Sequence, residues 1–149
     1  MLQSASRENR VTVLTASSGF VDFTLNLIIS MRRVKVENFV IIAEDLACYQ
    51  RLNGEFPGHV ALSVSPESAQ ANTSGGQEPG RKSGFTYGTK NYNELVGQRP
   101  RYLLQVLKHG YDVLYADTDA VWLEDPYKYF EPDFDLQIAS DKNGRSLMH

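Results

Sequence analysis

The feature that most constrains the fold is the alternation of short, largely apolar runs with segments of helical periodicity. Runs at 11–16, 38–43 and 59–64 are apolar nearly throughout rather than at every second residue, which is typical of strands buried on both faces. Between the first two runs, apolar residues recur at helical spacing over 20–34, and Asp45 is placed to cap a short helix before the third run. The order strand, helix, strand, helix, strand predicts an α/β fold with a mostly parallel sheet flanked by helices.

The stretch from 65 to 90 interrupts this pattern. It is rich in Ser, Gly, Pro, Asn and Gln, so we expect a long loop in which residues 70–82 are mobile. A helix should follow this loop. We expect Pro100 in its first turn, where the missing N–H costs no hydrogen bond, and Gly110 at its end.

Two more apolar runs, at 112–116 and 135–140, are predicted to complete the sheet. The 149 residues and the hydrophobic fraction of 42% suit a single domain over 1–149 with a substantial core. The formal net charge of −3, without a long basic run, argues against nucleic acid as a partner. Cys48 is the only cysteine in the sequence, and we expect it to pack as a small apolar residue.

The sequence offers mixed signals about the cellular compartment. No stretch has the roughly 18 consecutive apolar residues of a membrane-spanning helix, and the polar segment 1–10 lacks the apolar centre of a signal peptide. Asn72-Thr73-Ser74 is nevertheless an N-glycosylation sequon, which has meaning only in a secretory lumen. The sequon is either used in such a compartment or present by chance.

Polar residues follow several of the predicted strands. In open parallel sheets the carboxyl ends of the strands share one edge, where ligands bind and where helix amino ends favour anions. We therefore expect a site for an anionic ligand at this edge. The polar residues that would lie there are Thr15 and Ser17, Glu44 and Asp45, Asp117 and Asp119, and Asp141.

The tripeptide Asp117-Thr118-Asp119 is the strongest candidate for a metal site. The same spacing recurs at Asp133-Phe134-Asp135, so the spacing alone does not identify a site. The second tripeptide lies in a polar turn, whereas the first lies between apolar runs and is expected to be partly shielded from water. Two shielded carboxylates repel each other unless a cation lies between them, and Mg²⁺ and Mn²⁺ prefer such oxygen ligands. We therefore predict a divalent metal that also binds substrate phosphates, the alternative being a plain strand-end turn.

The segment from Gly110 to Pro126 reads Gly-Tyr-Asp-Val-Leu-Tyr-Ala-Asp-Thr-Asp-Ala-Val-Trp-Leu-Glu-Asp-Pro. It resembles the Asp-x-Asp segment of the nucleotide-diphospho-sugar transferase family. This glycosyltransferase group includes plant rhamnogalacturonan xylosyltransferases and extensin arabinosyltransferases. The likeness extends to the runs at 11–16, 38–43 and 135–141, and so covers nearly the whole chain. Its specific part is Asp-Thr-Asp-Ala-Val-Trp-Leu.

The resemblance implies a GT-A fold, a donor that is usually a UDP-sugar, dependence on Mn²⁺ (or Mg²⁺) and retention of the anomeric configuration. It implies that Asp117 and Asp119 are the metal ligands and that Arg101 reaches the diphosphate. By position, the residues implied in nucleotide-sugar binding are Thr15, Ala16, Asp45, Arg101, Asp117, Thr118 and Asp119.

Several of these assignments have competitors in the sequence itself. Asp45 is equally suited to capping a helix. Lys90 and Arg99 compete with Arg101 for the diphosphate. Asp141 is a candidate for contact with an acceptor hydroxyl, or it merely caps the segment that follows. No residue stands out as a catalytic nucleophile.

The chain ends soon after the fifth predicted strand, so we expect a GT-A domain whose C-terminal part is missing. The resemblance implies an enzyme of the Golgi lumen or membrane. It would transfer xylose, galactose or arabinose from a UDP-sugar to a glycan or glycoprotein. The shortened sheet is expected to expose apolar surface and to self-associate. The alternatives are an inactive module that binds a nucleotide-sugar or a partner, and a nucleotidyltransferase or phosphatase that uses the same aspartates.

Overall fold

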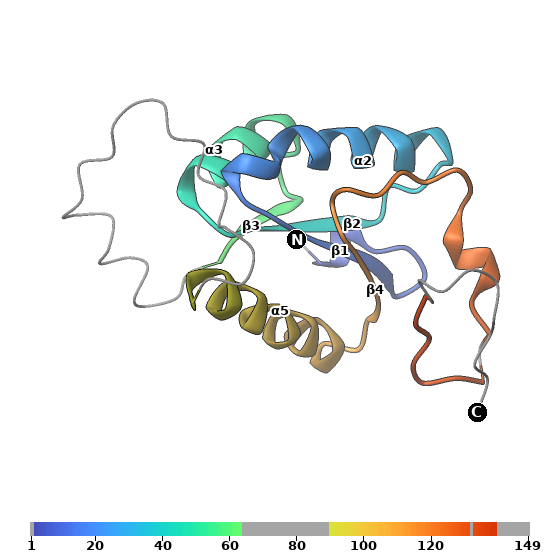
Figure 1. The fold of residues 1–149 in the computed structure, drawn as a ribbon. Helices are drawn as coiled ribbons and strands as arrows, with labels where there is room; N and C mark the ends of the chain where they lie inside the picture. Colours follow the sequence, from blue (N-terminus) through green and yellow to red (C-terminus); the bar gives the residue numbers. More distant parts are fainter. Residues whose placement is uncertain (1, 64–89, 132, 140–149) are drawn as a thin grey trace, which may run out of the picture.

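The computed structural model of the chain describes residues 2–63, 90–131 and 133–139 (Figure 1). Within these residues the strands form one parallel sheet in the order β3-β2-β1-β4. The α/β class predicted from the sequence is therefore confirmed. The strands are β1 (Arg10–Ala16), β2 (Phe39–Ala43), β3 (Val60–Leu62) and β4 (Asp112–Ala116).

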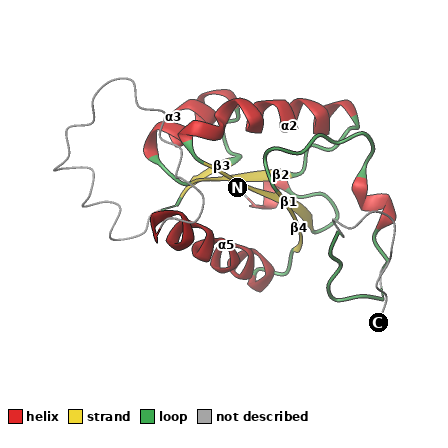
Figure 2. Cartoon of the chain, in the orientation of Figure 1, coloured by secondary structure: helices red, strands yellow, loops and turns green. Residues whose placement is uncertain are grey.

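Helices cover both faces of the sheet (Figure 2). Two of them, α2 (Val21–Arg33) and α3 (Leu46–Glu55), lie on one face, and α5 (Lys90–Lys108) lies on the other. Because both faces are covered, the central strands are apolar on both sides. Three short elements belong to the described fold as well: α1 (Leu2–Ala5), η1 (Ser18–Phe20) and η2 (Pro126–Tyr129).

The winding of the sheet changes direction at β1. The chain runs from β1 through β2 to β3 on one side, and then returns to place β4 on the other side of β1. The register pairs Ala16 with Ala43 of β2, and Leu14 with Ala116 of β4. In sheets of this type, ligands bind outside the carboxyl ends of the strands at such a switch point. The fold therefore directs attention to the carboxyl ends of β1 and β4.

The alternating side chains of β1 divide between two cores. Leu14 and Ala16 belong to the larger core, which lies beneath α2 and α3. Val11 and Val13 belong to a smaller core, which also contains Val106 of α5. This one strand therefore joins the two layers of helices through the sheet.

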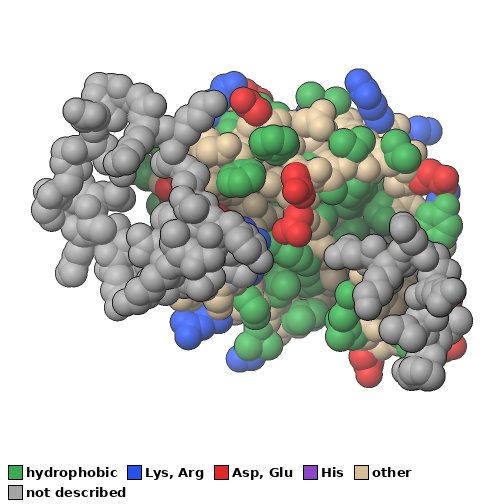
Figure 3. Space-filling view, in the orientation of Figure 1, with side chains coloured by type: hydrophobic (Ala, Val, Ile, Leu, Met, Phe, Trp, Pro, Cys, Tyr) green, Lys and Arg blue, Asp and Glu red, His purple; other side chains and the backbone are tan. Residues whose placement is uncertain are grey.

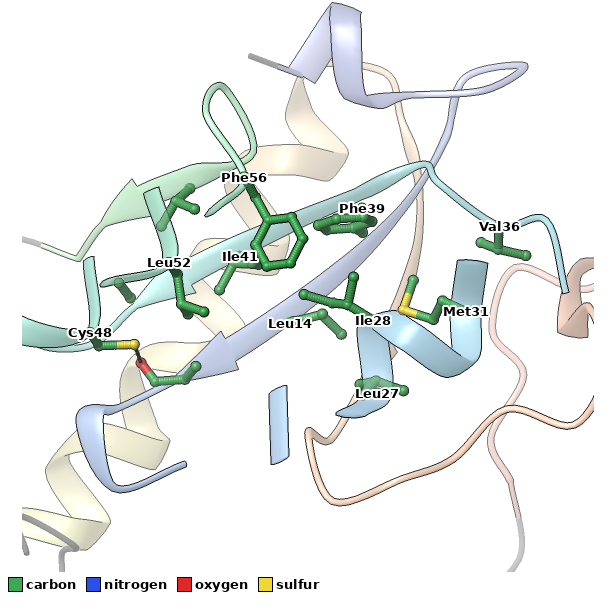
Figure 4. Packing of buried hydrophobic residues seen from close by; sticks show 13 residues of the cluster. Leu14, Leu27, Ile28, Met31, Val36, Phe39, Ile41, Cys48, Leu52 and Phe56 are labelled. Atoms are coloured by element: carbon green, nitrogen blue, oxygen red, sulfur yellow. Dashed lines mark hydrogen bonds between the residues drawn. The ribbon is translucent and has the colours of Figure 1, made fainter. Parts of the chain in front are cut away.

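The larger core is closely packed (Figure 4). The rings of Phe39 and Phe56 meet edge to face, with 5.8 Å between their centroids. The Cys48 thiol donates to the Ala16 carbonyl oxygen, with 3.4 Å between sulfur and oxygen. Burial raises the pKa of Cys48 to about 12, with nearby carboxylates adding to the effect, so the thiol stays neutral. The prediction that Cys48 packs as an apolar residue is confirmed.

The third strand and the helix that contains Pro100 differ from their predicted positions. The strand predicted at 59–64 is shorter, and spans Val60–Leu62. Pro100 lies in the interior of α5 rather than in its first turn, because the helix already begins at Lys90. A proline in the interior removes one backbone hydrogen bond from the helix. By contrast, Gly110 ends the helix as predicted, with a φ of +82° that glycine adopts without strain.

The predicted fifth strand is wrong over the residues that can be compared. Residues 135–139 form no strand, and the side chains of Leu136 and Ile138 are 74% and 81% exposed. A strand forms only where its N–H and C=O groups find partners, which apolar composition does not provide. Figure 3 shows that hydrophobic side chains reach the surface of the visible face between charged ones.

Three predictions fall outside the described residues: the mobile loop within 65–89, the sequon at Asn72 and the acceptor candidate Asp141. They stay predictions. No helix in the described part of the chain is long and apolar enough to cross a bilayer.

Leu27 and Leu123 offer a test of where the core lies. Leu27 is fully buried in the larger core, so Leu27→Ala should lower the free energy of unfolding by about 2–5 kcal/mol. Leu123 is 86% exposed, so Leu123→Ala should change it by less than about 0.5 kcal/mol. Chemical denaturation of both variants measures the difference, and equal losses would contradict the assignment of Leu27 to the core.

Candidate functional site

Hydrogen bonds join the carboxyl ends of β1 and β4. The Tyr115 hydroxyl donates to Asp117 Oδ1 across 3.2 Å, and it lies 3.1 Å from Thr15 Oγ1. Burial raises the pKa of Tyr115, so this hydroxyl keeps its proton and the Thr15 hydroxyl can donate to its oxygen. Asp117, directly after β4, is thereby linked to the end of β1.

Arg99 of α5 connects the ends of β2 and β4. Its Nε lies 3.4 Å from Glu44 Oε1, and its Nη1 lies 3.7 Å from Asp117 Oδ1. The Glu44 side chain is only 3% exposed, and burial raises its pKa although Arg99 acts in the opposite direction. One guanidinium therefore neutralises a buried carboxylate and also contacts an exposed one.

The pKa of Arg99 reflects this position. Burial acts to lower its pKa, but Tyr115, Glu44 and Asp117 together raise it above the ordinary value. Arg99 consequently stays charged at the edge of the sheet, between Glu44 and Asp117.

Asp45 caps α3 and ties the start of that helix to the segment after β1. Its Oδ1 accepts from the Cys48 N–H across 2.8 Å, and its Oδ2 accepts from the Ser18 N–H across 2.7 Å. The predicted helix cap is therefore confirmed. Because each carboxylate oxygen already accepts a backbone N–H, Asp45 holds the loop after β1 in place. A contact with uridine stays a prediction.

The expected shielding of Asp117 and Asp119 is wrong. The Asp117 side chain is 68% exposed and Asp119 is also exposed, while Thr118 between them is buried. The physical reason is that β4 is an edge strand of the described sheet, and the chain leaves the sheet directly after Ala116. Repulsion between buried carboxylates therefore gives no argument for a metal here.

The donor set still suits a hard divalent cation. Both aspartates offer exposed carboxylate oxygens, and such ions complete their shell with substrate phosphates and water. Within the part of the chain that the structure describes, no three His, Cys, Asp or Glu residues gather into a larger metal cluster. Asp117 and Asp119 therefore fit a metal that is shared with a ligand rather than one enclosed by protein.

The other residues implied by the family resemblance differ in their access to this edge. Thr15 and Ala16 are only 5% and 1% exposed, backbone included, and the Ala16 carbonyl already accepts the Glu44 N–H across 2.7 Å, so neither residue offers a ligand much surface. Arg101 is exposed, and its guanidinium donates to Gln98 Oε1 across 3.2 Å. Among the described residues it makes no ion pair with a strand-end carboxylate, whereas Arg99 does.

Sequence reasoning missed the network that organises the site. Glu44 was recognised only as a polar strand end, and Arg99 only as a competitor for phosphate. Tyr115 was treated as part of an apolar strand. The available signal was a hydroxyl-bearing aromatic residue near the end of a buried strand, since such residues usually find a hydrogen-bond partner when buried.

Comparison with known proteins gives a consistent result. The family model described as nucleotide-diphospho-sugar transferase matches residues 34–149. UDP-D-xylose:L-fucose alpha-1,3-D-xylosyltransferase 1 of Arabidopsis thaliana is 34% identical over 137 residues, covering 91% of this chain and 35% of the relative. UDP-galactose:fucoside alpha-3-galactosyltransferase of Dictyostelium discoideum is 29% identical over 145 residues, covering 88% of this chain and 22% of the relative.

A more distant relative is Beta-arabinofuranosyltransferase RAY1 of Arabidopsis thaliana, 27% identical over 132 residues, which are 85% of this chain and 22% of the relative. The chain spans about a third of the length of the xylosyltransferase that it matches. No solved structure matches the chain.

The cap made by Asp45 can be tested without any ligand. Asp45→Ala removes the acceptor of two backbone N–H groups and should lower the free energy of unfolding by about 1–2 kcal/mol. Asp22, in the first turn of α2, makes no side-chain cap, so Asp22→Ala should cost no more than about 0.5 kcal/mol. Urea denaturation compares the two variants; a loss no larger for Asp45→Ala than for Asp22→Ala would show that the cap does not stabilise the fold.

Proposed function

Because this chain belongs to the nucleotide-diphospho-sugar transferase family, we propose that it forms the donor-binding part of a glycosyltransferase. The enzyme would move a sugar from a UDP-sugar to an acceptor hydroxyl. The observation that carries the proposal is the position of Asp117 and Asp119 directly after β4, at the edge where β4 and β1 flank the switch point. The names of the relatives support the choice of UDP as the carrier.

In this proposal Asp117 and Asp119 hold Mn²⁺ or Mg²⁺ together with the diphosphate. When bound, the metal acts as a Lewis acid that neutralises charge on the departing diphosphate. Tyr115 holds Asp117 in place through the hydrogen bond of its hydroxyl. Thr118 is buried between the two aspartates and keeps their carboxylates on the exposed side of the chain.

We assign the diphosphate contact on the protein to Arg99 rather than to Arg101. Arg99 is the described cation that contacts Asp117, and Glu44 holds its guanidinium at the edge of the sheet. A guanidinium presents a fork of N–H donors that matches phosphate oxygens. When the metal occupies the aspartates, Arg99 is free to turn from Asp117 to the diphosphate while it stays paired with Glu44.

The nucleoside would lie against the loop that follows β1. Thr15 and Ala16, which end β1 just before this loop, are themselves buried and would support the nucleoside from beneath. Asp45 supports the loop by accepting the Ser18 N–H. Its contribution to nucleotide binding would then be through the position of the loop.

For the acceptor we favour a fucoside, or another glycan or glycoprotein that bears a free hydroxyl. Two relatives, from a plant and from Dictyostelium discoideum, name fucose or a fucoside together with two different donor sugars. The donor would be UDP-xylose, UDP-galactose or a UDP-linked arabinose, with retention of configuration and a Golgi location as the family resemblance implies. Asp141 stays our candidate for contact with the acceptor hydroxyl.

The two alternatives raised by the sequence make different predictions. An inactive module would bind UDP-sugars with a metal but would neither hydrolyse nor transfer the sugar. A nucleotidyltransferase or phosphatase would prefer nucleoside triphosphates or phosphate esters over UDP-sugars. The match to the nucleotide-diphospho-sugar transferase family favours sugar transfer over both alternatives.

The second Asp-x-Asp tripeptide provides a matched control for the metal assignment. In calorimetric titrations with UDP and Mn²⁺, Asp119→Ala should abolish metal-dependent binding because it removes half of the carboxylate pair. Asp135→Ala removes the same charge from an exposed residue outside the sheet and should leave the affinity nearly unchanged. The proposed metal site would be contradicted if UDP bound equally well with Mn²⁺ and in excess EDTA. It would also be contradicted if Asp119→Ala and Asp135→Ala lost the same UDP affinity.

Arg99 and Arg101 can be compared in the same titration. Because Arg99 also neutralises buried Glu44, both arginine variants are made on a Glu44→Gln background. On that background Arg99→Ala should weaken UDP binding by about tenfold or more, since a charge-assisted hydrogen bond is worth roughly 1.5–3 kcal/mol. Arg101→Ala should change the affinity by less than about twofold. The reverse order would restore Arg101 as the phosphate ligand.

A further inference from the structure

A hollow lies at the amino edge of the sheet, opposite the edge that carries Asp117. It is a cavity of about 200 Å³ between the turn that precedes β1, the start of β2, and η2. In Figure 1 the blue turn before β1 and the orange η2 lie at this same edge. Its lining holds three basic residues and two acidic ones together with two polar residues: Arg7, Arg10 and Lys128, Glu8 and Asp125, and Asn38 and Tyr127.

Arg7 and Arg10 face each other across a tight turn. The Arg10 N–H donates to the Arg7 carbonyl across 2.8 Å, and the Arg7 N–H donates to the Arg10 carbonyl across 3.0 Å. The central residues Glu8 and Asn9 have φ values of +53° and +60°, as in a type I′ turn, although neither is glycine. Residues paired in this way project their side chains to the same side. The turn therefore places Arg7 and Arg10 on the same side, and both residues line the cavity.

Neither arginine has a carboxylate partner in the described part of the chain. Glu8 lies between them in the sequence but forms no ion pair with either. The other carboxylates near the cavity are already engaged: Asp125 Oδ1 accepts the Tyr127 N–H across 2.9 Å, and Glu124 pairs with Lys128. Glu8 and Asp125 keep their negative charges in the cavity lining, where three basic side chains outnumber them.

The cavity is built from anchored groups. Asn38 is 6% exposed and donates to the Arg10 carbonyl across 3.0 Å. The Tyr127 hydroxyl lies 2.9 Å from Thr12 Oγ1, which fixes η2 against β1. The Asn9 carbonyl accepts the Asp112 N–H across 2.8 Å, which fixes the turn to β4. A ligand would therefore meet a largely preformed site and lose little affinity to ordering it.

The positive character continues beyond the cavity. A larger hollow of about 510 Å³ shares Arg7 and Asn38 with it and adds Arg32 and Lys35. Glu37 is the one carboxylate among the described residues of that lining. An anion approaching this edge consequently meets a basic surface before it reaches Arg7 and Arg10.

We propose that the cavity at the amino edge binds an oxyanion, a phosphate, sulfate or carboxylate group, between the guanidinium groups of Arg7 and Arg10. Forked N–H donors match the oxygens of such groups, and neither arginine forms an ion pair within the described part of the chain. Asn38 and Tyr127 form the polar floor of this site. It is separate from the proposed donor site and needs no metal. Either proposal can therefore be disproved while the other still holds.

The full chain is titrated at constant ionic strength with sodium sulfate, with inorganic phosphate and with D-glucuronate, while backbone amide shifts are followed by NMR. At least one ligand should cause saturable shifts at residues 7–10 and 125–128. The ligand that does so distinguishes an inorganic ion from the carboxylate of an acidic sugar. In Arg7→Gln/Arg10→Gln its dissociation constant should rise by about tenfold or more.

The control variant is Arg33→Gln/Arg51→Gln, which loses the same two charges from α2 and α3, outside both hollows. Its dissociation constant should stay within about twofold of that of the parent chain. If the glutamine pair at the turn unfolds the chain, Arg7→Lys/Arg10→Lys keeps the charge but loses the fork, and it should still weaken binding. The proposal is overturned if none of the three ligands gives saturable shifts, or if the control loses as much affinity as the turn variants.

Discussion

The central strand β1 is the element on which the rest of the molecule depends. It is hydrogen-bonded to β2 on one side and to β4 on the other, and its side chains enter both cores. Its carboxyl end carries Thr15, which meets the Tyr115 hydroxyl, and its amino end begins at Arg10, in the turn that lines the basic cavity. The strand-end residues at the carboxyl edge and the cavity at the amino edge are therefore positioned by one buried strand, which burial on two faces keeps rigid.

At the carboxyl edge of the sheet, one arginine is shared by two carboxylates that differ in burial. Arg99 is shared between Glu44, which is buried, and Asp117, which is exposed. Its bond to the buried carboxylate is the one that the fold needs, because a buried unpaired charge is costly. Its contact with Asp117 is long and open to solvent, so it contributes little to stability. The contact of Arg99 with Glu44 is therefore fixed, whereas its contact with Asp117 can be exchanged for another anion, which suits the proposed binding of a charged ligand.

The sequence predicted the elements whose cause is local. Apolar runs marked β1, β2 and β4, helical periodicity marked α2, and the position of Asp45 correctly indicated a cap. Features that depend on contacts between residues far apart in the chain could not be predicted from the sequence. The link from Glu44 through Arg99 to Asp117 joins three elements, and no local pattern shows that they meet. The shielding expected for Asp117 was wrong for the same reason, since flanking apolar residues do not reveal that β4 lies at a sheet edge. Residues 135–139 have the composition of a strand but lack a partner that would make them one.

The pairing of β4 with β1 has a consequence for how the chain folds. Asn38 bonds Arg10 across 28 positions, whereas the contact between Thr15 and Tyr115 spans 100. Contacts between residues far apart in the chain form more slowly. Closing the longer loop costs conformational entropy, and this cost comes before the contact contributes any favourable free energy. The layer of β1, β2 and β3 with α2 and α3 can therefore assemble first, and β4 docks onto a preformed edge. Asp117 follows that strand, so the proposed donor site would form only after β4 has docked, and chains without a docked β4 would not bind the proposed ligand.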